Sequence, residues 1–222
     1  MLQSRLFAIG DVHGCAATMK HLFWNILRIE AGDTIVLLGD IVDRGPDTKG
    51  VLDEIFFLKK KEIKVILLRG NHEEIMMNAF TSNQANTYWC NVGGTAVLDS
   101  FKTDSIMDIP DEYVELIDSS VNYFEVDNFI FVHAGLNFDI SNPLDDTHAM
   151  RWIRKMPSSD RWLKSRKLIH GHTPEPIDKI IYNQNPIINL DGGCVYADHG
   201  ELGFLVALEM NSKQYFYARN CE

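Results

Sequence analysis

Short apolar runs alternate with amphipathic stretches through the first third of the chain. Leu6–Ile9, Thr34–Leu38 and Ile63–Leu68 each have the length and composition of a buried strand. Between the first two runs, apolar residues recur at three- and four-residue steps from Met19 to Ile29, the spacing of a helix with one buried face. Pro46 can open a second helix, because the first turn does not use its missing N–H. This alternation predicts strand and helix units that feed a largely parallel sheet.

The rest of the chain has a different pattern. From Glu73 onwards the pattern is helical but irregular, and we expect a helical insert at about 73–121. Val121–Val126 and Phe129–Val132 are predicted to be two strands, since the Asp and Asn between them suit a tight turn. The remaining strands are predicted at Lys167–Ile169, Lys179–Tyr182, Pro186–Leu190, Leu202–Leu208 and Gln214–Tyr217. A chain of 222 residues is expected to form a single domain, 1–222.

The composition argues against several classes of protein. The chain has 21 Lys and Arg residues against 31 Asp and Glu, and its net charge of −10 is poorly suited to binding nucleic acid. No run approaches the ~18 apolar residues that a membrane span needs. The amino-terminal stretch has no basic leader or secretory cleavage site, and the four cysteines form no CxxC pair. We therefore expect a cytoplasmic protein with reduced thiols and with neither a membrane nor a nucleic-acid partner.

Side chains that can bind metals follow the three early strands and two of the later apolar runs. Loops at the carboxyl edge of a parallel sheet are where α/β proteins place ligand sites. We expect six side chains to converge there: Asp11, His13, Asp40, Asn71, His133 and His172. Mixed oxygen and nitrogen donors suit Mn²⁺, Fe or Zn²⁺. Six ligands are too many for one open catalytic ion, so we expect two divalent ions with Asp40 bridging them.

The segments that carry these side chains resemble those of the PPP-type metallophosphatases, in sequence and in order. They read GDVHG from Gly10, GDIVDRG from Gly39, GNHE from Gly70, HAG from His133 and GHT from Gly171, and a similar tail, NLDGG, begins at Asn189. The resemblance implies a four-layer α/β/β/α sandwich with two mixed sheets. It also implies a metal-binding hydrolase, with manganese the leading candidate and with a metal-bridging hydroxide that attacks the phosphate in line.

The resemblance further implies roles for residues beside the ligands. His72 follows the ligand Asn71 and would protonate the leaving oxygen as a general acid, while Asp43 would hold its imidazole. Arg44 would clamp phosphate oxygens, because the planar guanidinium matches their geometry. Asn71 would contact the phosphate as well as a metal.

A second arginine is expected to complete the phosphate clamp. We choose Arg154 over Arg151, because Trp152-Ile153-Arg154 matches a Trp-Ile-Arg segment of bacterial members of the family. Arg154 can equally lie on a solvated helix face, and this alternative stays open.

Four further residues are interpreted as supporting or packing residues. His170 can support the neighbouring His172, Cys15 is expected to be a small buried packing residue, and core packing is favoured over substrate entry for Tyr88 and Trp89.

The family resemblance leaves the substrate open. The leading interpretation is a serine/threonine protein phosphatase that acts on a phosphorylated protein substrate, with phosphotyrosine as a further target. The main alternative is a symmetrical diadenosine tetraphosphatase, which uses the same ligands on a dinucleoside polyphosphate. A catalytically idle scaffold is a remote alternative, because every ligand is present. The sequence leaves the oligomeric state unknown.

Overall fold

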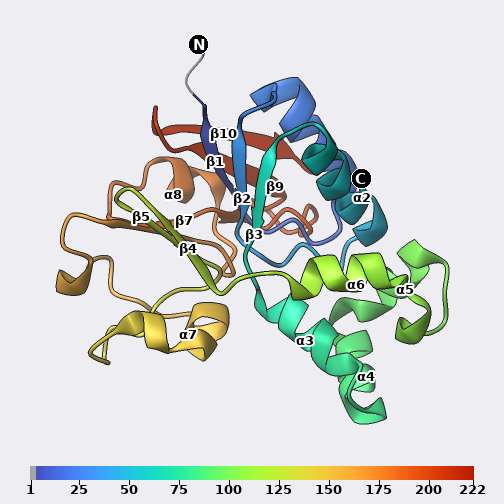
Figure 1. The fold of residues 1–222 in the computed structure, drawn as a ribbon. Helices are drawn as coiled ribbons and strands as arrows, with labels where there is room; N and C mark the ends of the chain where they lie inside the picture. The colour runs from blue at the N-terminus through green and yellow to red at the C-terminus, as the bar shows by residue number, and fades with distance from the viewer. Residues whose placement is uncertain (1–3) are drawn as a thin grey trace.

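The computed structural model describes residues 4–222, which form two β-sheets packed face to face (Figure 1). The larger sheet has the order β10-β9-β1-β2-β3, with β8 paired to β9, and the smaller sheet has the order β4-β5-β6-β7. The strands of the larger sheet are β1 (Leu6–Ile9), β2 (Thr34–Leu37), β3 (Lys64–Leu67), β8 (Asp191–Gly192), β9 (Phe204–Glu209) and β10 (Gln214–Arg219). Those of the smaller sheet are β4 (Tyr123–Val126), β5 (Phe129–Val132), β6 (Lys167–His170) and β7 (Ile187–Asn189). Both sheets are mixed, because β9 runs antiparallel to β1 and β4 runs antiparallel to β5.

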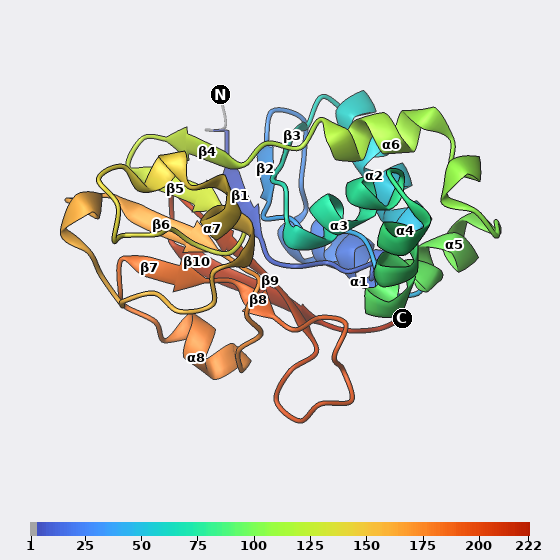
Figure 2. The same cartoon turned by 90° about the horizontal axis from the view of Figure 1, so that it is seen from below.

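Helices lie beside both sheets (Figure 2). The α-helices are α1 (Ala16–Lys20), α2 (Thr48–Lys60), α3 (Asn71–Ala79), α4 (Asn83–Trp89), α5 (Thr95–Phe101), α6 (Asp111–Asp118), α7 (Thr147–Trp152) and α8 (Ile177–Ile181). Short π and 3₁₀ turns are η1 (His21–Leu27), η2 (Cys90–Gly94), η3 (Ile106–Asp108), η4 (Pro143–Asp145) and η5 (Arg161–Leu163). Figure 2 shows α1–α6 on the side of the larger sheet and α7 and α8 on the side of the smaller one. Within residues 4–222, no helix has the length and apolar content to cross a membrane.

The alternation of side chains along each strand builds the layers. In β1, Phe7 and Ile9 pack with the helices of the larger sheet, while Ala8 faces the other sheet. In β5, Phe131 meets Ala8 in the core between the sheets, while Ile130 packs on the outer side with Met150 of α7. The order of layers is therefore helix, sheet, sheet, helix, and the predicted α/β/β/α sandwich is confirmed.

The apolar stripe predicted from Met19 lies on α1 and on the π-helical turn η1 that continues it, which confirms the helix, and Arg28 follows η1 with a left-handed φ of 49°. One prediction about the second helix needs correction. Pro46 does not open the second helix. The side chain of Asp47 caps it by accepting a hydrogen bond from the N–H of Gly50 at 2.8 Å, and α2 begins one residue later.

The strand and hairpin predictions are confirmed to within about two residues at each end, with one exception. The segment between α3 and α6 is helical, as its pattern predicts. The run Lys179–Tyr182, predicted as a strand, instead belongs largely to the short helix α8. Pro176 precedes that helix, and Ile177 and Ile180 pack one turn apart against the core between the sheets. Such a short apolar run does not distinguish helix from strand by its pattern alone.

Truncating Phe131 tests the packing between the sheets. Because Phe131 is fully buried there, Phe131→Ala is expected to lower the free energy of unfolding by about 3–5 kcal/mol. Phe57→Ala is the matched control, since Phe57 is 43% exposed, and its cost should stay below about 1 kcal/mol. Urea unfolding followed by circular dichroism measures both changes, and equal costs would contradict the sandwich core.

Candidate metal centre

The loops that follow five strands bring the six predicted ligands to one place. Loops after β1, β2 and β3 carry the ligands from the larger sheet, and loops after β5 and β6 carry those from the smaller sheet. All six side chains are at most 4% exposed: Asp11, His13, Asp40, Asn71, His133 and His172. The centre therefore lies where the carboxyl ends of parallel strands from both sheets meet.

Asp40 lies between imidazoles from both sheets. Its Oδ2 is 3.5 Å from Nε2 of His13 and 3.4 Å from Nε2 of His133. The same nitrogen of His133 is 3.1 Å from Oδ1 of Asn71 and 3.1 Å from Nδ1 of His172. The lone-pair atoms of these side chains therefore lie close together. Two sets of donor side chains can each hold a metal ion, and Asp40 belongs to both sets.

Backbone carbonyls select the tautomers of two of these imidazoles. Nδ1 of His13 lies 2.8 Å from the carbonyl oxygen of Val42, and Nδ1 of His133 lies 2.9 Å from that of Leu38. A carbonyl only accepts hydrogen bonds, so each Nδ1 carries the proton and each Nε2 presents its lone pair to the centre when the ring is neutral. This is the way in which outer hydrogen bonds orient metal-binding histidines in proteins.

The buried charges favour a cation at this point. Burial disfavours the charged form of Asp40, yet the positive charge on nearby imidazoles, His133 foremost, lowers the pKa of Asp40 well below its ordinary value. Burial also opposes protonation of His133, but the Asp40 carboxylate overcomes it and raises the pKa of His133 to about 10. Burial lowers the pKa of His13 and of His172 to about 3, which keeps both imidazoles neutral. The neutral imidazoles of His13 and His172 beside this carboxylate are donors that fit a divalent metal ion.

Asp11 is placed differently from the other ligands. The backbone N–H of His172 donates to both of its carboxylate oxygens at 3.1 Å, so Asp11 ties the loop after β1 to the loop after β6. His72 also lies close to His13 and Asp40, because the donor atoms of these three side chains are within 4.8 Å of one another. Burial, and next the charge of Asp191, raise the pKa of Asp11 well above its ordinary value.

The backbone of the centre is strained at five of its non-glycine residues. Their φ angles are positive: His13 (45°), Asp40 (48°), Asp43 (68°), Arg44 (70°) and His172 (73°). Each left-handed residue costs roughly 1–2 kcal/mol, and such conformations persist only where the surrounding structure holds them. Gly39, with φ of 99°, takes a shape that no other residue fits, because a Cβ there would lie 2.7 Å from the nitrogen of Gly70. The concentration of strain marks the centre as a functional site.

Glu73 is a residue whose role the sequence did not predict. Its buried carboxylate accepts hydrogen bonds at 2.8 Å from the N–H groups of Asp40, Ile41 and Gly70. It therefore fastens the loop after β2 to the start of α3. An acidic residue at the third position of a helix is the signal of a capping box and could have indicated this role.

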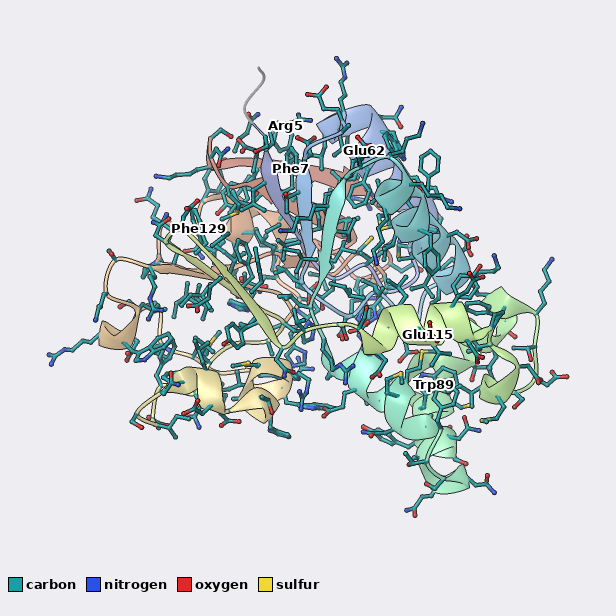
Figure 3. All side chains as sticks on the ribbon, viewed as in Figure 1. Arg5, Phe7, Glu62, Trp89, Glu115 and Phe129 are labelled. Atoms are coloured by element: carbon teal, nitrogen blue, oxygen red, sulfur yellow. The ribbon has the colours of Figure 1, made fainter. Side chains whose placement is uncertain are left out.

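His72 and Asp43 form a buried pair beside the ligands. Nδ1 of His72 lies 2.7 Å from Oδ2 of Asp43, whose other oxygen accepts a hydrogen bond from Nε1 of Trp89 at 2.8 Å. Trp89 lies fully buried among the helices α3 to α6, which confirms its core packing and adds an orienting role (Figure 3). Packing was the wrong prediction for Tyr88, which is 53% exposed on the outer side of α4.

The arginines lie at opposite ends of the ligand set. Nη1 of Arg44 is 2.7 Å from Nε2 of His13, and Nη1 of Arg154 donates to the carbonyl oxygen of His172 at 3.4 Å. Arg151 is engaged elsewhere, because it pairs with Glu74 at 2.9 Å. The geometry thus favours Arg154 over Arg151 as the second arginine near the ligands.

Three other buried groups surround the centre. Cys15 is fully buried as expected and donates to the carbonyl oxygen of His13 at 3.6 Å. Nδ1 of His170 contacts the carbonyl oxygen of Gly171 at 3.0 Å, and no hydrogen bond joins it to a ligand side chain within residues 4–222. The sequence indicated no role for Asp191. Burial raises the pKa of its carboxyl to about 7.

Comparisons with known proteins agree with this geometry. The family model described as calcineurin-like phosphoesterase matches residues 4–201. An asymmetrical bis(5'-nucleosyl)-tetraphosphatase from Oceanobacillus iheyensis is 28% identical over 219 residues, which cover 86% of this chain and 84% of the relative. Serine/threonine-protein phosphatase 1 of Salmonella typhimurium is 33% identical over 89 residues, which cover 40% of this chain and 38% of that protein. The solved structure of a protein serine/threonine phosphatase from Saccharomyces cerevisiae superposes with a TM-score of 0.66 at 16% identity, covering 99% of this chain and 81% of that one.

The chain belongs to the calcineurin-like phosphoesterase family and is a metallophosphatase of the PPP type. The family uses a dinuclear metal site, and the convergent buried donors of this chain fit such a site.

Removing the carboxylate of Glu73 tests the support of the centre. Glu73→Ala leaves three buried N–H groups without their partner and is expected to lower the free energy of unfolding by about 3 kcal/mol. Urea unfolding in the presence of a chelator measures the change without a contribution from metal binding. Glu115→Ala on the exposed side of α6 is the control and should cost less than about 0.5 kcal/mol. A loss of stability no larger than that control would contradict the supporting role.

Proposed function

We propose that the protein hydrolyses dinucleoside tetraphosphates at its metal centre. The observation that carries the proposal is the near-full-length match to the tetraphosphatase of Oceanobacillus iheyensis, against 40% coverage of this chain by the Salmonella phosphatase. The arginines support it, since Arg44 lies at the His13 end of the ligands and Arg154 at the His172 end. Cations at both ends suit a chain of phosphates that is charged along its length. This order reverses the preference that the sequence alone suggested.

The residues of the centre then have distinct tasks. Two divalent ions, when held by the six ligands, activate water and neutralise charge on the transferred phosphoryl group. Arg44, Arg154 and Asn71 bind phosphate oxygens and orient the phosphate. Asp43, held in turn by Trp89, orients the His72 imidazole, which can donate a proton to the leaving oxygen. Manganese is the leading candidate for the ions from the resemblance to the family, and the oxygen and nitrogen ligands suit Mn²⁺, Fe and Zn²⁺ alike.

A second candidate function is the dephosphorylation of phosphoserine and phosphothreonine in proteins. The buried pair of His72 and Asp43 favours it, since an alkoxide leaving group needs a proton more than a polyphosphate leaving group does. The Salmonella relative carries the name of such a phosphatase. The intact ligand set gives no support to a catalytically idle scaffold.

Metal removal and a choice of substrates test the proposal. A chelator should abolish turnover and Mn²⁺ should restore it, because the buried donors leave the centre incomplete without a cation. The restored enzyme is expected to prefer diadenosine tetraphosphate over a phosphothreonine peptide by at least about tenfold in kcat/KM. Chromatography of the products separates asymmetrical cleavage to AMP and ATP from symmetrical cleavage to ADP.

Other outcomes of this experiment are equally clear. A comparable preference for the peptide would replace the proposal with the second candidate. Turnover of neither substrate by protein that holds two ions would contradict both functions.

Replacing His72 tests its role as proton donor. His72→Asn should leave the bound metal unchanged and lower turnover of a phosphothreonine peptide by roughly 10²–10⁴. The loss on diadenosine tetraphosphate should be smaller, because a polyphosphate leaves without a proton more readily than an alkoxide. His21→Asn, on the exposed side of η1, is the control for general effects of losing an imidazole. Equal losses on both substrates would argue that His72 has a positioning role instead.

A further inference from the structure

A pocket of about 460 Å³ opens beside the metal centre, at the carboxyl edge of the smaller sheet. We call it the Tyr182 pocket, and its lining includes Arg154, Met156, Glu175, Lys179, Tyr182 and Gln184. Residues of the loop after α7 line one part of it, and residues of α8 and the turn that follows α8 line another. The volume lies in the range of pockets that enclose a small organic ligand.

Arg154 connects this pocket to the metal centre. Its guanidinium lines the pocket and donates to the carbonyl oxygen of the ligand His172 at 3.4 Å. Ala134, next to the ligand His133, and Thr173, next to His172, also line the pocket. The pocket therefore lies directly beside two of the predicted ligands, and a substrate bound at the centre can extend into it.

The pocket supplies positive charge in a chain whose net charge is −10. Arg154 and Lys179 are both exposed, and neither forms a salt bridge within residues 4–222. Glu175 is the acidic residue in the lining, so the cations exceed the acids there. Two uncommitted cations beside a phosphoesterase centre are suited to phosphate groups next to the one that reacts.

The outer part of the pocket offers an aromatic surface on an ordered turn. Tyr182 is 76% exposed, an unusual state for a large ring that packing could otherwise bury. The Asn183 side chain holds the turn, because its Nδ2 donates to the carbonyl oxygen of Ile187 at 2.9 Å and its Oδ1 accepts from the N–H of Asn185 at 2.9 Å. Gln184 also lines the pocket, and its amide makes no hydrogen bond within residues 4–222, so it can both donate and accept.

We propose that the Tyr182 pocket binds the nucleoside end of the substrate. The base stacks on Tyr182, the neighbouring amides contact its edge, and Lys179 and Arg154 bind the phosphate next to the nucleoside. An exposed ring with mixed donors and acceptors fits a planar heterocycle, whereas a peptide would require an extended groove. The inference rests on the proposed function, since it names the part of a dinucleotide that this surface holds.

Kinetics with a large and a small substrate test the pocket. Stacking of a base on an aromatic ring is worth about 1–3 kcal/mol, so Tyr182→Ala should raise KM for diadenosine tetraphosphate by roughly 5- to 150-fold. Lys179→Gln should raise KM for diadenosine tetraphosphate about threefold or more, as expected for the loss of a charge at a partly solvated site. Neither variant should change kcat, nor either constant for p-nitrophenyl phosphate, which is too small to reach the pocket.

Two matched variants control for loss of a ring or of a charge elsewhere. Tyr123→Ala removes an exposed ring from the far edge strand of the same sheet, and Lys60→Gln removes an exposed charge from the end of α2. Both should leave all constants unchanged. Unchanged KM for the dinucleotide in both pocket variants would overturn the inference, and so would an equal rise for p-nitrophenyl phosphate.

Failure of the proposed function is recognised separately. If the wild-type enzyme turns over p-nitrophenyl phosphate but not diadenosine tetraphosphate, inhibition by AMP and by inorganic phosphate decides about the pocket. The inference holds when AMP inhibits more tightly than phosphate and Tyr182→Ala removes that advantage. It is overturned when AMP and phosphate inhibit equally, or when the pocket variants raise KM for a phosphothreonine peptide instead.

Discussion

The buried carboxylate of Asp40 stands between imidazoles that come from different sheets. Its Oδ2 lies 3.5 Å from His13 of the larger sheet and 3.4 Å from His133 of the smaller one, and its Oδ1 accepts the N–H of His72 at 2.9 Å. A buried negative charge is costly unless partners surround it. The two sheets, the ligand loops and His72 therefore depend on Asp40 for their relative positions. A divalent cation is the partner that suits this buried carboxylate best.

The rest of the fold keeps the loops around Asp40 in conformations that they would not adopt alone. Left-handed backbone at Asp40, Asp43 and Arg44 opposes folding, and the three hydrogen bonds to Glu73 help to hold this segment in place. Packing between the sheets around Phe131 makes the framework rigid enough to bear the strain. Close packing beneath the centre therefore supports the strained backbone at the centre.

Chemistry and specificity occupy different parts of the molecule. In the proposed mechanism the ligands and the pair of His72 and Asp43 would serve a phosphate ester or an anhydride alike, and relatives carry the names of both tetraphosphatases and protein phosphatases. The periphery distinguishes substrates by what lies beyond the reacting phosphate. Arg154 belongs to both regions, since it contacts the loop of a ligand and lines the Tyr182 pocket, so it is the point where substrate preference can act on catalysis.

The ligand types, their order and most strands follow from the sequence, because glycine-bounded polar segments after apolar runs are local signals that tertiary packing does not alter. Non-local contacts decided the rest. The sequence could not show that Glu73 reaches the loop after β2 or that Trp89 orients Asp43. The strand predicted at Lys179–Tyr182 is wrong, because a four-residue apolar run fits a helix as well as a strand. Only packing against the sheets selects the helix. The sequence by itself indicated the types of residue that can bind metal, whereas the tertiary structure alone decided the pocket beside them, because its walls bring the loop after α7 and the turn after α8 together with the ends of the motif segments.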